Sequence, residues 1–275
     1  MNLSDSLRLR FADDMDLSIN PRLPSVFHSM ISRGSCRQFK AEPVDEELCR
    51  LLCAAALAAP TKSDLQQRDI VLVRKPEVKA ELVTLVSDQA WIRDVPNIAV
   101  FCGNHLRQRQ LHELTGHAFA NDHLDAFFNA SVDAAIALSA FVTAAEAAGL
   151  GCCPISAVRN EAEAVGNLLG LPDLVFPVAG LAFGYPKSEP PTISMRLPLS
   201  ETVHIDRFEN SDSRAAIEVY DLRRRAHQPY GEQRAENLFG NSEHYGWSED
   251  KSRQYAQPER QDFGAFIKNK GFTLD

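Results

Sequence analysis

A long apolar run extends from Phe127 to Ala148 and is rich in alanine, leucine, valine and phenylalanine. A run of this length fits either a membrane-spanning helix or a helix buried in a protein core. Asn129, Asp133 and Glu146 interrupt it, whereas a spanning helix needs roughly 20 predominantly apolar residues with few charges. We therefore expect a central core helix that is packed on all sides and ends at Gly149, and no membrane association.

Shorter patterns surround this central helix. Continuous apolar and β-branched runs predict buried strands, and apolar residues at helical spacing predict helices. The expected strands are Asp69–Arg74, Ile98–Cys102, a short strand or turn opened by Cys153, and Pro177–Gly184. Three expected helices begin near Ser25, Pro43 and Glu77. A fourth is expected to follow Asn160, its predicted N-cap, and a last one lies around Phe263–Lys268. The polar stretch after Pro186 has too little apolar content for a core of its own, so we expect it to pack on the main body or on a partner subunit.

Charge and cysteine usage restrict partners and compartment. The chain has 29 basic and 37 acidic residues, a net charge of −8, whereas nucleic-acid-binding proteins usually carry a basic surplus. Four aspartates in the first twenty residues exclude a secretory signal, since its apolar region would not contain them. Without an export signal, the six cysteines are expected to remain thiols. We expect a cytoplasmic protein that does not bind nucleic acid.

Three short motifs suggest other chemistries. Gly149-Leu150-Gly151 begins like a dinucleotide fingerprint, but Pro154 stands where the third glycine belongs. His112 and His117 are five residues apart, so they leave a shared helix face, and we expect no metal site but a mobile polar excursion. Cys152-Cys153 leaves open a thiol-dependent hydrolase, although no base is fixed beside the pair. A non-catalytic ligand-binding protein is the other alternative outside redox chemistry.

An ordered set of segments indicates a family. The segments are Ser32–Phe39, with the sequence SRGSCRQF, Ala59–Gln66, with the sequence APTKSDLQ, and Gly149–Ile155, with the sequence GLGCCPI. The set resembles the nitroreductase family, FMN flavoproteins that typically show Arg-x-Ser-x-Arg-x-Phe, a Pro-Ser-x-x-Asn-x-Gln turn and a helix ending in Gly-Leu-Gly. Glu81–Leu85 with Gln89, and Arg196-Leu197-Pro198, are similar to the larger, typically NADPH-using, oxygen-insensitive group.

This resemblance covers about Val26 to His204 well and the tail loosely. It implies an α+β fold with a central, mainly antiparallel sheet flanked by helices. Residues 1–24 would be an N-terminal extension, 25–205 the FMN-binding core and 206–275 a C-terminal extension. It also implies an intertwined homodimer in which each C-terminal tail is exchanged onto the partner subunit.

The resemblance also implies an FMN site, and the chemistry of the residues agrees, because a dianionic phosphate calls for planar, permanently charged donors. The implied phosphate contacts are Arg33, Gly34, Ser35, Arg37 and Arg196. The implied contacts of the flavin ring are Lys62, Asp64, Gln66 and Gln89 on the N1 and O2 side, and the backbone of Pro154, Ile155, Ser156 and Ala157 on the N5 side. Thr61 is a further implied cofactor contact. Departures from the family pattern are Asp64 for asparagine, Ser156-Ala157 for a pair ending in glycine, and Ser194 for a lysine.

The implied activity is ping-pong hydride transfer from NADPH or NADH through FMN to an aromatic acceptor such as a nitroarene or a quinone. The chemistry would be carried by FMN N5, with no catalytic side chain and no metal. Arg260 or Arg225 would meet a carboxylate of the substrate or a nicotinamide phosphate. The alternative on the same fold is flavin reduction or another flavin chemistry, such as dehalogenation or flavin fragmentation.

Overall fold

The structure is a computed structural model that describes residues 2–12, 25–86, 90–188, 192–209 and 212–275. The chain forms two compact units. The first unit combines Met1–Arg33 with Thr192–Glu259, and the second combines Gly34–Pro191 with Arg260–Asp275. The second unit therefore contains the central sheet and also the last residues of the chain.

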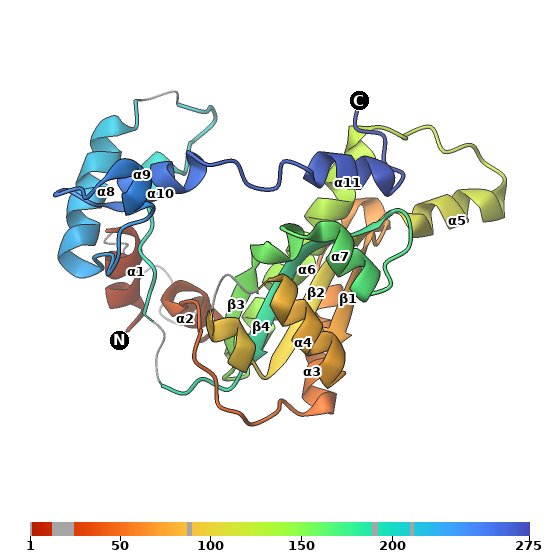
Figure 1. The fold of residues 1–275 in the computed structure, drawn as a ribbon, viewed down its shortest axis with the longest axis horizontal. Helices are drawn as coiled ribbons and strands as arrows, with labels where there is room; N and C mark the ends of the chain where they lie inside the picture. Colours follow the sequence, from red (N-terminus) through yellow and green to blue (C-terminus); the bar gives the residue numbers. More distant parts are fainter. Residues whose placement is uncertain (1, 13–24, 87–89, 189–191, 210–211) are drawn as a thin grey trace. The chain divides into compact units, whose positions relative to one another are not determined.

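A four-stranded sheet with the strand order β1-β2-β4-β3 forms the centre of the second unit (Figure 1). Its strands are β1 (Arg68–Val73), β2 (Asn97–Asn104), β3 (Gly151–Ile155) and β4 (Val175–Gly184). Each neighbouring pair is antiparallel. The antiparallel sheet implied by the resemblance is confirmed, and each of the four strands overlaps a stretch that the sequence predicts.

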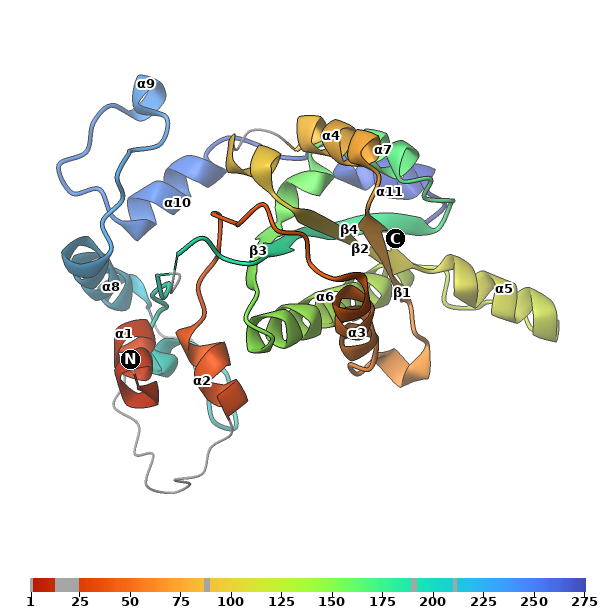
Figure 2. The ribbon, with the colours of Figure 1, turned by 90° about the horizontal axis from the view of Figure 1, so that it is seen from below.

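Helices cover both faces of this sheet (Figure 2). Those on one face are α3 (Glu46–Leu57) and α6 (Leu124–Ala147), and those on the other are α4 (Pro76–Leu85) and α7 (Ala162–Leu168). Side chains of β2 alternate between the faces, because successive strand residues point in opposite directions. Ala99 and Phe101 pack with α3 and α6, whereas Ile98 and Val100 belong to the cluster on the other face. Because both faces are covered, exposed functional groups have to come from the strand ends and connecting loops.

Helix α6 is not packed on all sides, so that expectation is wrong. Its buried face consists of Ala126, Ala130, Asp133, Ala134, Ala137, Phe141, Val142 and Ala145. Phe128 is 60% exposed and Val132 is 37% exposed, because the chain's own helices cover one side only. Of the described residues, α6 is the one helix long and apolar enough to cross a membrane. Its contacts with the sheet and with α3 are those of a core helix.

The remaining helices include several that the sequence patterns do not predict. In the second unit they are α5 (Leu106–Thr115) and α11 (Phe263–Asn269), and in the first α1 (Leu3–Phe11), α2 (Ser25–Ser32), α8 (Arg214–His227), α9 (Glu236–Phe239) and α10 (Trp247–Tyr255). Only α2 and α11 are expected from the sequence. The others mix polar and apolar side chains, so no continuous apolar run marks them in the sequence.

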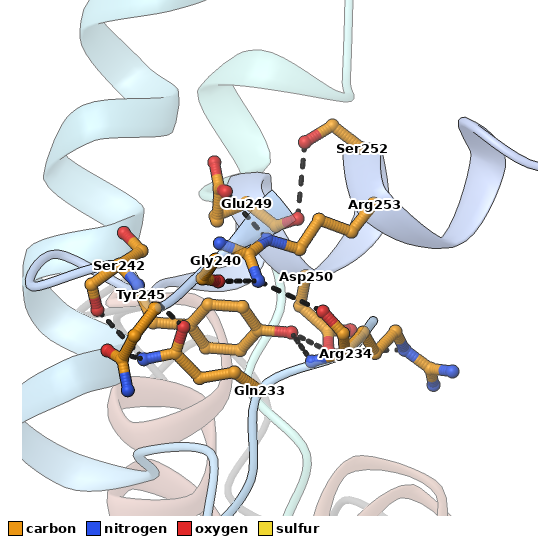
Figure 3. Close-up of polar contacts among 10 residues, drawn as sticks. Gln233, Arg234, Gly240, Ser242, Tyr245, Glu249, Asp250, Ser252 and Arg253 are labelled. Atoms are coloured by element: carbon orange, nitrogen blue, oxygen red, sulfur yellow. Dashed lines mark hydrogen bonds and ion pairs between the residues drawn. The ribbon is translucent and has the colours of Figure 1, made fainter. Parts of the chain in front are cut away.

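Polar contacts hold the first unit together around α10 (Figure 3). Arg253 is 4% exposed and donates to the carbonyls of Arg234 at 3.0 Å and Gly240 at 2.9 Å. Asp250 is 2% exposed and accepts a hydrogen bond from the Tyr245 hydroxyl at 2.8 Å. Thr192–Glu259, most of the polar segment after Pro186, is thus compact together with Met1–Arg33, and buried polar groups supply much of the interior of this unit.

Candidate functional site

The turn between α3 and β1, residues 61–67, has an unusual backbone. Ser63, Asp64 and Gln66 have φ angles of 48°, 58° and 52°, in the left-handed region that residues other than glycine rarely adopt. Three such residues in one turn persist only where the surroundings fix them, and strained turns of this kind concentrate at functional sites. The 61–67 turn is therefore a candidate site on backbone geometry alone.

Asp133 of α6 fixes this turn. Its carboxylate is fully buried and accepts hydrogen bonds from the Thr61 hydroxyl at 2.6 Å and the backbone N–H groups of Lys62 at 2.9 Å and Gln67 at 3.0 Å. Sequence reasoning treats Asp133 only as an interruption of an apolar run. The one available signal is that a carboxylate in a buried helix face needs donors to satisfy it.

The 61–67 turn presents polar side chains to solvent. The Gln66 amide donates to Asp64 Oδ1 at 3.1 Å, and the Lys62 ammonium donates to the Ser63 hydroxyl at 3.3 Å. The Asp64 carboxylate, a departure from the family pattern, thus has an amide of the same turn as its partner. Lys62, Asp64 and Gln66 are exposed, so their donors and acceptors can meet a ligand.

A second group of predicted residues lies at the end of β3. Pro154 and Ser156 are exposed, whereas Ile155 and Ala157 are buried. Arg260 reaches this strand end, where it donates to the Ser156 hydroxyl at 3.3 Å and to Asn160 Oδ1 at 2.8 Å. The structure therefore brings together two parts of the predicted site that are separated by about a hundred residues.

The prediction that Asn160 is the N-cap of α7 is wrong. Asn160 is the C-cap of the short helix η4 (Ser156–Arg159), and Glu161 is the N-cap of α7. The Asn160 side chain accepts from Arg260 instead.

The loop after α2 contains the residues that match Arg-x-Ser-x-Arg-x-Phe. All of them except Arg33 belong to the second unit. Cys36 is buried, and its backbone N–H donates to the Cys152 carbonyl at 2.9 Å, which fixes the loop beside β3. This approach requires glycine at position 151, since a Cβ there would lie 2.6 Å from Cys36 Sγ. Cys36 is buried, whereas the guanidinium of the next residue, Arg37, is exposed and lies 5.9 Å from the centre of the Trp91 ring.

Two predicted phosphate ligands, Arg33 and Arg196, belong to the first unit. Arg10 of α1 joins them, because its guanidinium donates to the carbonyls of Ile31 at 2.6 Å and Arg33, while its own carbonyl accepts from the Arg196 N–H at 2.7 Å. Arg223 Nη2 donates to the carbonyls of Arg10 at 3.1 Å and Arg196 at 2.8 Å. Sequence reasoning missed Arg10 and Arg223, which have no motif to mark them.

The predicted site residues fall into both units. The first unit contains Arg33 and Arg196, and also Arg225, whose guanidinium lies 3.3 Å from His244 Nδ1. The second unit contains Gly34, Ser35, Arg37, Thr61, Lys62, Asp64, Gln66, Pro154, Ile155, Ser156, Ala157 and Arg260. Gln89 lies outside the described residues.

The thiol and metal alternatives receive little support from the structure. Cys152 is fully buried and Cys153 is 3% exposed, so neither sulfur can meet a substrate from solvent. Helix α5 ends at Thr115 with Gly116 as its C-cap, which leaves His117 outside the helix. The part of the chain that the structure describes contains no group of three or more potential metal ligands.

Comparison with known proteins agrees with the motif order. The nitroreductase family model matches residues 30–185, and the model of the family's C-terminal domain matches residues 194–275. An FMN reductase (NADPH) of Bacillus subtilis is 30% identical over 253 residues, which cover 90% of this chain and 98% of that protein. An FMN reductase [NAD(P)H] of the same organism is 32% identical over 201 residues, 71% of this chain and 80% of that protein.

Solved structures agree with the sequence comparison. NfrA2 of B. megaterium has a TM-score of 0.82 at 28% identity, with 92% of this chain and 100% of that chain covered. The NADPH:FMN oxidoreductase from Vibrio harveyi, solved in complex with NAD+, has a TM-score of 0.77 at 26% identity, with 90% and 98% covered. In motif order, in fold and along nearly its whole length, this chain is a member of the nitroreductase family.

Proposed function

We propose that this protein is an FMN-dependent NAD(P)H oxidoreductase. The observation that carries the proposal is the match over 90% of the chain to a relative named FMN reductase (NADPH). The exposed polar residues of the 61–67 turn and of the β3 end support it, because the family motifs fall on these two segments.

The donors in the chain fit FMN. A phosphate dianion suits guanidinium groups, and Arg37 and Arg196 both expose theirs. The flavin ring needs donors around its polar edge, which the Lys62 ammonium and the Gln66 amide can supply. We propose that the FMN contacts are Arg33, Gly34, Ser35, Arg37, Thr61, Lys62, Asp64, Gln66, Gln89, Pro154, Ile155, Ser156, Ala157 and Arg196.

The chain's residues would act by binding and orientation. When bound, FMN would supply the two-electron hydride chemistry between NADPH or NADH and a second molecule, in a ping-pong cycle. The positive charge of Lys62 would stabilise negative charge on the ring. Arg260, which Asn160 and Ser156 hold in place, would meet a substrate carboxylate or a nicotinamide phosphate, with Arg225 as the second candidate.

We further propose a homodimer in which the C-terminal extension packs on the partner subunit through residues 206–259, because residues 260–275 belong to the second unit of their own chain. Exposed apolar side chains on the helices that cover one face of the sheet support it, since large exposed apolar groups often mark interfaces. These side chains are Leu51 and Leu57 of α3 and Leu124, Phe128 and Val132 of α6. A cytoplasmic location fits the six cysteines, which form no disulfide in the part of the chain that the structure describes.

The activity is tested by the absorption spectrum of the purified protein. We expect a yellow flavoprotein whose visible absorption is bleached by NADPH or NADH under anaerobic conditions. A protein that neither contains nor takes up FMN would contradict the proposal. An acceptor screen then separates the two activities of this fold: nitroarenes and quinones are the proposed acceptors, whereas turnover with free flavin alone would favour flavin reductase activity, the activity in the relatives' names.

Arg37→Ala and Arg196→Ala test the phosphate contacts. Each variant is expected to weaken FMN binding about 10- to 150-fold, because a hydrogen bond to a charged group contributes about 1.5–3 kcal/mol. Quenching of FMN fluorescence during titration of the apoprotein measures the affinity. Arg50→Ala is the matched control, since Arg50 is an exposed arginine of α3 paired with Glu47, and it should bind FMN as the parent does. Unchanged affinity in both test variants would refute the assignment.

A further inference from the structure

The beginning of α5 lies beside the 61–67 turn. Strand β1 begins at Arg68 and pairs antiparallel with β2, so that Arg68 lies opposite Gly103 near the end of β2. The segment before β1 and the segment after β2 therefore meet at the same end of the sheet. There the backbone N–H of Asn104 donates to the Gln67 carbonyl at 3.0 Å, and α5 follows directly.

Two side chains from the first turn of α5 hold neighbouring carbonyls of the 61–67 turn. The Gln108 amide donates to the Leu65 carbonyl at 2.6 Å. The Arg107 guanidinium donates through Nη1 to the Gln66 carbonyl. Because Leu65 and Gln66 belong to no helix or strand, the direction of their backbone depends on contacts of this kind.

The Arg107 guanidinium is itself held in place. Its Nη2 donates to Asp69 Oδ1 at 2.8 Å, and the Asn104 amide donates to the other oxygen of the same carboxylate. Asn104 Oδ1 in turn accepts from the Arg107 backbone N–H at 3.2 Å. Arg107 therefore links Asp69 of β1 to the Gln66 carbonyl, and the planar fork of its guanidinium serves both acceptors at once.

The two contacts differ in burial. Gln108 is 5% exposed, so its amide needs a partner such as the Leu65 carbonyl. The side chains of Arg107 and Asp69 are 45% and 40% exposed, and exposed ion pairs of this kind add little to the stability of a fold. The Arg107 contact thus fixes the geometry of the turn more than it stabilises the second unit.

Asp133 and the two α5 residues hold different parts of the turn backbone. Asp133 accepts from N–H groups at both ends of the turn, whereas Arg107 and Gln108 donate to carbonyls in its second half. A turn that is held in one conformation before binding spares the ligand the cost of ordering it. The side chains of the turn that are proposed to contact FMN take no part in these contacts and stay exposed: Lys62, Asp64 and Gln66.

We propose that Arg107 and Gln108 are positioning residues of the flavin site. By holding the carbonyls of Leu65 and Gln66, they keep the 61–67 turn in the conformation that directs its side chains at FMN. This inference rests on the proposed FMN-dependent function. Neither residue belongs to a segment that carries the family motifs.

Titration of the full-length apoprotein with FMN, followed by quenching of FMN fluorescence, tests the proposal. Gln108→Leu and Arg107→Gln are each expected to weaken FMN binding about 2- to 12-fold, the range that one hydrogen bond usually contributes. Gln110→Leu is the matched control for the first variant, because Gln110 is an exposed glutamine of the same helix. Arg50→Gln is the control for the second, since Arg50 is an exposed arginine of α3. Both controls should bind FMN as the parent does.

Arg107→Lys separates positioning from charge. An ammonium cannot reproduce the planar fork that reaches the Gln66 carbonyl and Asp69 together, so this variant should also bind FMN more weakly than the parent. If it binds FMN as tightly as the parent while Arg107→Gln does not, the positive charge alone acts on the FMN anion. That result would overturn the positioning role of Arg107.

Hydrogen exchange of the full-length protein as purified measures the release of the turn itself. The backbone N–H groups of Lys62 and Gln67, which Asp133 holds, are expected to exchange about 2- to 12-fold faster in Arg107→Gln and Gln108→Leu. The N–H groups of Val100 and Phe101, in the middle of β2, should exchange as in the parent. Equal acceleration at all these positions would show that the variants only destabilise the second unit, and the proposal would be wrong.

The proposed function and this inference fail in different ways. A parent protein that takes up no FMN would overturn the proposed function and this inference with it. If the parent binds FMN, and Arg107→Gln and Gln108→Leu match their controls both in FMN affinity and in exchange at Lys62 and Gln67, this inference alone is overturned.

Discussion

Replacing Asp133 with alanine is expected to lower the free energy of unfolding of the second unit by about 3–5 kcal/mol and to reduce FMN retention. The fully buried carboxylate accepts from Thr61, Lys62 and Gln67. A hydrogen bond to a charged group contributes about 1.5–3 kcal/mol, and the loss leaves buried donors unpaired. The left-handed residues of the 61–67 turn would then lose the contacts that hold them, and the proposed FMN contacts on the turn would lose their positions.

Urea denaturation followed by tryptophan fluorescence measures this effect. The chain has two tryptophans, of which Trp91 lies in the second unit and Trp247 in the first. In a Trp247→Phe background, the fluorescence therefore reports on the second unit alone. Thr143→Ala is the matched control, because Thr143 lies on the same helix and its hydroxyl donates to Ser139 O of that helix. If Asp133→Ala were as stable as this control, Asp133 would not be what holds the turn.

The sequence predicts the sheet well for a physical reason. Strands covered by helices on both faces read as continuous apolar runs, and the β2 residues Ile98–Cys102 are all at most 2% exposed. The long helix α6 is predicted for the same reason. The exposure of Phe128 could not be predicted, because it depends on what packs against α6 and not on the sequence of the helix itself.

Several helices of the first unit could not be predicted, because their stability comes from distant polar contacts. Helices α1 and α8 meet through Arg10 and Arg223, which are 213 residues apart. Local patterns carry no signal for such a pair. The candidate site also combines local and distant residues. The motifs identify Thr61, whereas its hydrogen-bond partner Asp133 lies 72 residues away and has no motif of its own.

The second large effect is expected in the first unit, at Arg253. Arg253→Ala should lower the free energy of unfolding of this unit by about 2–4 kcal/mol. The side chain is 4% exposed, and its loss removes the donor to the carbonyls of Arg234 and Gly240 and the 2.7 Å contact from Nε to Glu249. The guanidinium also lies over the rings of Phe239 and Tyr245, so packing is lost with the charge.

Two further variants separate buried hydrogen bonding from charge. Arg253→Lys keeps the charge, but an ammonium cannot reproduce the planar fork that reaches two carbonyls and a carboxylate, so its stability should fall between the parent and Arg253→Ala. Arg214→Ala removes an arginine whose side chain is 85% exposed and paired with Asp212, and no measurable change is expected. The fluorescence of Trp247 in a Trp91→Phe background measures the unfolding of both variants. Because salt screens exposed pairs far more than buried ones, the effect of Arg253→Ala should persist in 1 M NaCl, and its disappearance there would show that exposed charge pairing dominates at this position.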